Sequence, residues 1–155
     1  MSIPNRFEWT RMPGVGPGPE ALGDLRGRTV VEIGCGSGHN LAHLVVHRGA
    51  RGIGIDSDST KIERATRLYG DLSEISFHLA DAAEELKALP ASSVDVCLSI
   101  FGAVSFSDPG PILFAAAHAL KPAGLLALTL RADDHHDTVL MLSRKADTER
   151  CLAYI

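Results

Sequence analysis

The chain has 155 residues, of which 45% are hydrophobic and 22% charged, a length and balance typical of a single globular domain. Its net charge of −4 excludes a generally basic nucleic-acid-binding protein. Its uncharged stretches are too short to cross a bilayer, and its first ten residues, MSIPNRFEWT, lack the apolar core of a secretory signal. Three cysteines without a CxxC pair indicate free thiols in a reducing compartment. We therefore expect a cytoplasmic protein that does not associate with membranes.

The first 24 residues differ in composition from the rest. Residues 12–20 read MPGVGPGPE, which is too rich in Pro and Gly for a regular helix or a central strand. Phe7 and Trp9 precede this segment as apolar anchors. We expect residues 1–19 to form an arm over the domain, either as a lid or as a structural wrap, followed by a short helix near residues 20–25.

From residue 29 onward, patterns typical of strands and helices alternate. Apolar and β-branched runs predict strands over residues 29–33, 52–55, 75–79, 94–100 and 125–130. Helical patterns fall between them, over residues 40–47, 60–69, 84–89 and 109–120. Thr60 and Glu63 have capping-box spacing, and Asp108 before Pro109 is a typical helix start. The alternation predicts an α/β fold with a Rossmann-like, doubly wound, mainly parallel sheet.

The strongest functional signal is a glycine-rich loop directly after the first predicted strand. Glu32 to Gly38 has the form E-x-G-x-G-x-G. Glycine lets a ligand approach the backbone closely, and the following helix start offers free N–H groups. Asp56 ends the second predicted strand, where an acid can accept both hydroxyls of a ribose. Asp81 and Ala82 follow the third strand, where a carboxylate and a backbone N–H suit an adenine edge.

The spacing argues against a dinucleotide site. Such a site requires G-x-G-x-x-G, with its third glycine packing the helix on the strand. Here the third glycine comes one residue early, and His39 occupies the position that needs glycine.

Taken together, these motifs resemble class I S-adenosylmethionine-dependent methyltransferases. The matching segments, in the order of that family, are VVEIGCGSGHN (30–40), GIDSDSTKIERA (54–65), LADAAE (79–84), SVDVCLSIFGAVSF (93–106) and LKPAGLLALTL (120–130). The resemblance implies a domain over residues 1–155 with a cofactor-binding core at 28–131, S-adenosylmethionine as cofactor and S-adenosylhomocysteine as product. The cofactor-binding residues it implies are Glu32, Gly34, Cys35, Gly36, Gly38, Asp56, Ser57, Asp81, Ala82 and Ser99.

The acceptor is predicted largely from missing motifs. After the fourth strand the chain reads Ser-Ile-Phe-Gly, without the Pro-Pro motif of amino-methylating nucleic-acid enzymes. With the negative net charge, this favours O- or N-methylation of a small molecule and no nucleic-acid partner. Trp9, Phe101 and Phe106 are expected to border the acceptor pocket, and His135 and His136 are the candidate bases, although a solvated loop explains these histidines equally well.

Two features remain to be interpreted. His39, His43 and His47 recur every four residues, which suits a metal site, but a solvated polar helix face is the better interpretation, and we expect no metal. The segment 132–155 is short for this family, so we expect a reduced hairpin or an irregular helix there. An incompletely covered fifth strand would then self-associate or bind a partner. A cofactor-binding module or partner subunit without transfer activity of its own is therefore the alternative function.

Overall fold

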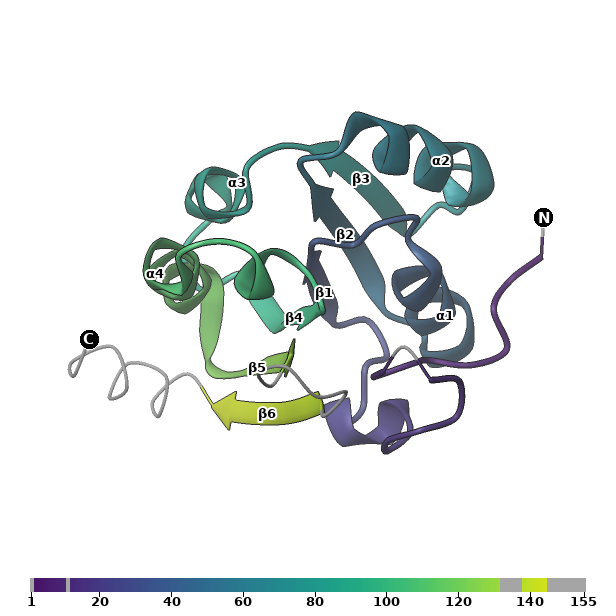
Figure 1. Ribbon diagram of the computed structural model, residues 1–155, viewed down its shortest axis with the longest axis horizontal. Coiled ribbons are helices and arrows are strands. Elements are labelled where there is room, and N and C mark those ends of the chain that lie inside the picture. Colours follow the sequence, from purple (N-terminus) through teal and green to yellow (C-terminus); the bar gives the residue numbers. More distant parts are fainter. Residues whose placement is uncertain (1, 11, 132–137, 145–155) are drawn as a thin grey trace.

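A sheet with the strand order β3-β2-β1-β4-β5-β6 forms the centre of the computed structural model, which describes residues 2–10, 12–131 and 138–144 (Figure 1). The strands are β1 (Thr29–Ile33), β2 (Arg51–Asp56), β3 (Ile75–Leu79), β4 (Val94–Ile100), β5 (Leu120–Arg131) and β6 (Thr138–Arg144). Neighbouring strands from β3 to β5 are parallel. The predicted Rossmann-like, mainly parallel sheet is thus confirmed.

The helices cover both faces of the sheet. They are η1 (Pro19–Leu22), α1 (His39–Arg48), α2 (Ser59–Tyr69), α3 (Ala82–Ala88), η2 (Ala103–Ser105) and α4 (Pro109–Ala119). In Figure 1, α1 and α2 lie on one side of the sheet, and α3 and α4 on the other. None of these described helices has the length and apolar character needed to cross a membrane.

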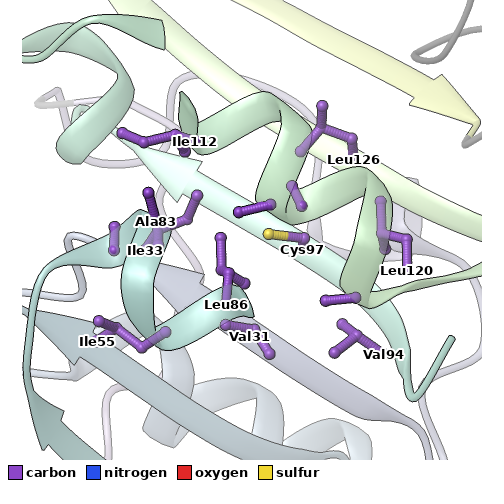
Figure 2. Close-up of a cluster of buried hydrophobic side chains, with 14 of the residues drawn as sticks. Val31, Ile33, Ile55, Ala83, Leu86, Val94, Cys97, Ile112, Leu120 and Leu126 are labelled. Atoms are coloured by element: carbon purple, nitrogen blue, oxygen red, sulfur yellow. The ribbon is translucent and has the colours of Figure 1, made fainter. Parts of the chain in front are cut away.

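One hydrophobic core lies between the sheet and the α3–α4 pair (Figure 2). Val31 and Cys97 of the central strands are fully buried, and Leu86 of α3 packs against the same cluster. Both central strands are buried on both faces because helices cover both, which is why their sequences are mostly apolar.

The second core lies on the opposite face and includes the N-terminal arm. Phe7 and Trp9 are buried there, with ring centroids 4.8 Å apart in an edge-to-face arrangement. The arm is fixed to α1 by a reciprocal pair of hydrogen bonds. The Glu8 backbone N–H donates to Asn40 Oδ1 at 3.0 Å, and Asn40 Nδ2 donates to the Glu8 carbonyl at 2.8 Å.

The arm also corrects the interpretation of the histidine stripe. His43 is only 6% exposed and its Nδ1 lies 2.9 Å from the Pro4 carbonyl, while His39 Nδ1 lies 2.6 Å from the Tyr69 hydroxyl. The prediction of a solvated face is wrong at His43, because helical periodicity does not reveal a distant segment that covers a polar side, whereas His39 and His47 are exposed as predicted. The described residues contain no cluster of three or more His, Cys, Asp or Glu able to hold a metal ion.

Three helix starts can be compared with the sequence. The prediction that Asp108 caps α4 is confirmed, since its carboxylate accepts from the Gly110 N–H. The capping box at Thr60 is wrong, because Asp58 caps α2 and accepts from the N–H groups of Thr60 and Lys61. Likewise, α3 begins at Ala82 rather than at residue 84, because Asp81 caps it.

The C-terminal edge also differs from expectation. β6 runs antiparallel to β5, with Thr138 opposite Arg131 and Arg144 opposite Leu125. The prediction that β5 has an incompletely covered edge is therefore wrong, and β6 takes the outer position of the sheet. The rest of the segment in which a reduced hairpin or an irregular helix is expected, residues 132–137 and 145–155, lies outside the described residues.

Candidate functional site

Two adjoining cavities open where the loops leave the carboxyl ends of β1 to β4. The larger, about 630 Å³, lies between the glycine loop and the arm, and the smaller, about 360 Å³, lies beside the ends of β2, β3 and β4. Gly34, Lys61 and Phe101 line both. The chain crosses from one side of the sheet to the other between β1 and β4, which is where open α/β sheets bind ligands.

The glycine loop is held open by backbone contacts. The N–H groups of Gly34 and Cys35 both donate to the Ile55 carbonyl, at 2.8 and 3.0 Å, which ties the loop to β2. At Gly36, φ is +55° and an added Cβ would meet no atom within 4 Å. The loop therefore presents a bare backbone surface to the larger cavity, as close ligand approach requires.

Asp56 braces this loop from the end of β2. One carboxylate oxygen accepts from the Gly36 N–H and the other from the Asp58 N–H, each at 2.9 Å. The residue is 8% exposed and lines the smaller cavity together with Ser57. Because each oxygen accepts one protein N–H, each retains a lone pair for a hydroxyl donor.

Asp81 and Ala82 lie in the same cavity and begin α3. Asp81 Oδ1 caps the helix by accepting from the Glu84 N–H at 3.0 Å. The Asp81 side chain is exposed, whereas Ala82 is buried. One oxygen of Asp81 thus has a structural partner. The described lining of this cavity includes three aspartates, Asp56, Asp58 and Asp81, and one lysine, Lys61.

Glu32 is the most unusual group at the site. It is 3% exposed, lines the larger cavity, and its Oε2 has no hydrogen-bond partner among the described residues. Burial, and to a smaller extent repulsion by Asp56, raise the pKa of Glu32 to about 8, although a hydrogen bond from the Leu41 backbone works against this rise. The carboxyl group is therefore mainly protonated at neutral pH.

Cys35 and Ser99 lie deeper than the sequence suggests. Cys35 lines the larger cavity but is only 7% exposed, and burial raises the pKa of its thiol, so it is not a nucleophile at neutral pH. Ser99 is 1% exposed and lies behind the loop after β4, where a Cβ on Gly102 would approach its Oγ to 2.7 Å. Gly38 is the N-cap of α1 and adopts a left-handed conformation.

The three aromatic residues expected at the acceptor pocket fall in different places. Phe101 lines both cavities, and Phe106, which is 69% exposed, lines the smaller one. Trp9 is only 1% exposed and packs in the second core, so the prediction that it borders the pocket is corrected. Its neighbours Glu8 and Thr10 line the larger cavity instead.

The expected bases His135 and His136 lie outside the described residues. The structure adds residues that the sequence analysis did not select, and among them Arg6, His39, Asn40 and Lys61 line the larger cavity. His39 and Asn40 had a sequence signal, because they are the first residues of the helix that follows the glycine loop. Arg6 had none, because only the folded arm brings it to the cavity.

The comparisons with known proteins agree with this geometry. Residues 31–128 match the family described as "Methyltransferase domain". The chain is 31% identical over 122 residues to the ubiquinone biosynthesis O-methyltransferase of Bordetella avium, covering 78% of this chain and 46% of that protein. It is 31% identical over 140 residues to the tRNA U34 carboxymethyltransferase of Shewanella halifaxensis, covering 87% of this chain and 39% of that protein.

Solved structures share the fold. A putative methyltransferase in complex with the Haloferax volcanii Trm112 methyltransferase activator is 30% identical, with a TM-score of 0.58, covering 70% of this chain and 47% of that one. Phosphoethanolamine N-methyltransferase 2 of Haemonchus contortus, solved with S-adenosylhomocysteine, has a TM-score of 0.64 at 21% identity, covering 72% and 26% of the two chains.

The fold and the matched family model together define the class of protein: a Rossmann-like domain of the kind that uses S-adenosylmethionine as its cofactor. The chain belongs to the class I S-adenosylmethionine-dependent methyltransferase family. It spans about half the length, or less, of the curated relatives it matches. The names of those relatives refer to ubiquinone biosynthesis in one case and to tRNA in the other, so family membership alone does not exclude a nucleic-acid acceptor.

Proposed function

We propose that this chain binds S-adenosylmethionine across the two adjoining cavities and transfers its methyl group to a small molecule. The observation that carries the proposal is the Asp56 carboxylate, which braces the open glycine loop and lines the cleft at the same time. When bound, S-adenosylmethionine supplies an activated methyl group. The remaining work belongs to the chain, which must hold and align the two reactants.

The residues present fit the proposed cofactor. Asp56 retains acceptor capacity for ribose hydroxyls, and Asp81 with Ala82 offers a carboxylate and a backbone N–H for an adenine edge. The larger cavity then receives the amino-acid end, where Arg6 and Lys61 provide cations for a carboxylate, and Gly34 and Gly36 allow close approach.

The charge of the cleft supports a small-molecule acceptor. Asp56, Asp58 and Asp81 line the smaller cavity with Lys61 as its one described cation, and an arrangement of this kind repels a phosphate backbone. Beside the cofactor, Phe101, which lines both cavities, and the exposed ring of Phe106 offer the apolar surface that a small organic acceptor needs. His135 and His136 remain the proposed bases for an acceptor that arrives protonated.

A second candidate function is a cofactor-binding subunit that transfers no methyl group without a partner. The observation in its favour is the 30% identical Haloferax volcanii relative, which was solved in complex with a methyltransferase activator protein. Incubating the pure chain with methyl-labelled cofactor, a pool of small metabolites and, separately, tRNA distinguishes the possibilities. Label in small molecules supports the first function, label in tRNA overturns the choice of acceptor, and bound cofactor without any transfer favours the second.

Cofactor binding itself is tested by titration calorimetry with S-adenosylhomocysteine. Asp56→Ala should weaken binding at least about tenfold, because two ribose hydroxyls lose a charged acceptor and the loop loses its brace. Asp71→Ala is the matched control, since it removes an equally charged, exposed residue that lines neither cavity. Equal affinity of the two variants would remove Asp56 from the site.

A further inference from the structure

A carboxyl group that is both buried and incompletely hydrogen-bonded lines the larger cavity. Glu32 comes from β1, is 3% exposed, and its Oε2 has no partner among the described residues. A buried carboxylate with one oxygen left without a partner is costly to maintain, so the neutral form is favoured in the ligand-free chain.

The surroundings of Glu32 contain both negative and positive groups. Asp56 on β2 repels a charge on Glu32, and the Leu41 backbone of α1 donates a hydrogen bond that favours one. The other titratable groups on the walls of the larger cavity are Arg6 and Glu8 of the arm, Cys35, His39 of α1 and Lys61 of α2. No cation forms an ion pair with Glu32 among the described residues.

The proposed ligand brings positive charge to this cavity. S-adenosylmethionine carries an ammonium and a sulfonium group, and a positive charge near a carboxyl group favours its ionised form. We infer that Glu32 carries a proton in the ligand-free cleft and releases it to solvent when the cationic cofactor binds, so that cofactor affinity is linked to pH through this one residue. This inference rests on the proposed function, because it requires the cofactor in the larger cavity.

The linkage has a defined sign. At neutral pH the free chain is protonated at Glu32, where the pKa is about 8, so binding releases close to one proton. Affinity for S-adenosylmethionine then rises by up to about tenfold per pH unit as the pH approaches 8 from below. Below pH 6.5 the His39 imidazole titrates as well, so the informative range is pH 6.5 to 8.

The test is titration calorimetry of the full chain with S-adenosylmethionine at pH 7 in phosphate and in Tris, two buffers that differ in ionisation enthalpy. The wild-type chain should release close to one proton, and Glu32→Gln, which keeps the shape but cannot ionise, should release much less and bind with an affinity that changes far less than that of the wild type between pH 6.5 and 8. Equal proton release by both chains, or none by the wild type, overturns the inference. If neither chain binds cofactor while both are folded, the proposed function itself fails, which is a separate outcome.

If the Glu32→Gln chain does not fold, a second measurement on the unmodified chain tests the same inference. Infrared difference spectroscopy of the unmodified chain should show the C=O stretch of a protonated carboxyl group before ligand is added, and its loss after saturation with S-adenosylmethionine. A spectrum without that loss, while binding is detected by calorimetry, contradicts the inference.

Discussion

Gly34 and Gly102 lie so close that a Cβ on Gly34 would be 2.5 Å from the Gly102 Cα. The two residues belong to the loops after β1 and β4, which are the adjacent strands at the centre of the sheet. A Cβ on Gly102 would in turn collide with the Ile33 carbonyl oxygen. The contact is between two backbones and cannot relax by a side-chain rotation, so it sets how closely the loops after β1 and β4 approach each other.

Gly34→Ala should therefore destabilise the chain more than Gly36→Ala does. Both positions have positive φ, +71° and +55°, which costs an alanine about 1–2 kcal/mol. Only Gly34 adds a collision with backbone, for a further ~1–3 kcal/mol. Urea unfolding of the two variants measures the difference in their free energy of unfolding. Equal losses of stability would show that the loops after β1 and β4 move apart readily.

The protonation of Glu32 should also appear in the stability of the ligand-free chain. The pKa of Glu32 is about 8 in the folded chain against 4.5 for an ordinary Glu, so the folded state binds a proton that the unfolded state releases. This contribution to stability is complete below pH 4.5 and is lost as the pH rises through 8.

Two histidines of α1 act in the opposite direction, but in a separate range of pH. Burial, together with the positive charge of Arg64 near His39, lowers the pKa of both His39 and His43, so these residues destabilise the fold only as the pH falls below 6.5. Between pH 6.5 and 8 the free energy of unfolding should decrease by about 1–2 kcal/mol in the wild type. Chemical denaturation at several pH values checks this, and Glu32→Gln should show a flat profile over the same range.

Trp9 should stabilise the arm rather than select the acceptor. Trp9→Ala should cost about 3–5 kcal/mol, because the residue is 1% exposed and packs among Phe7, Leu22 and Leu25. Phe106→Ala is the matched aromatic control: its side chain is 69% exposed, so its loss should change stability by no more than about 0.5 kcal/mol. Thermal unfolding separates the two, and a loss of stability at Trp9 as small as that at Phe106 would contradict the stabilising role of Trp9.

How much the sequence predicts depends on how local each feature is. The strands 75–79 and 94–100 match their predicted bounds because each is a short apolar run between turn residues. The N-cap at Asp108 is local in the same way. Burial of His43 and Trp9, and the pairing of β6 with β5, depend on contacts between segments far apart in the chain, which periodicity does not encode.

The same distinction applies to the site. The loop from Glu32 to Gly38 and the acids at the ends of β2 and β3 are visible in the sequence, because a parallel sheet brings the carboxyl ends of its strands to one edge. The neutral state of Glu32 cannot be predicted from the sequence, because it follows from burial and from the lack of a hydrogen-bond partner at Oε2 among the described residues. Arg6 reaches the cavity only through the folded arm.

Asp81 has two roles that substitution can separate, because its carboxylate caps α3 and also lines the smaller cavity. Asp81→Ala removes both roles and should cost about 1 kcal/mol of stability. Asp81→Ser keeps a capping oxygen without the carboxylate, and should recover most of that stability but none of the lost affinity for S-adenosylhomocysteine. Asp108→Ala is the control, because it removes the equivalent cap from α4 at a residue that lines neither cavity, and should reduce stability alone. Thermal unfolding and calorimetry on the three variants give both quantities, and full affinity in Asp81→Ser would leave Asp81 with the structural role only.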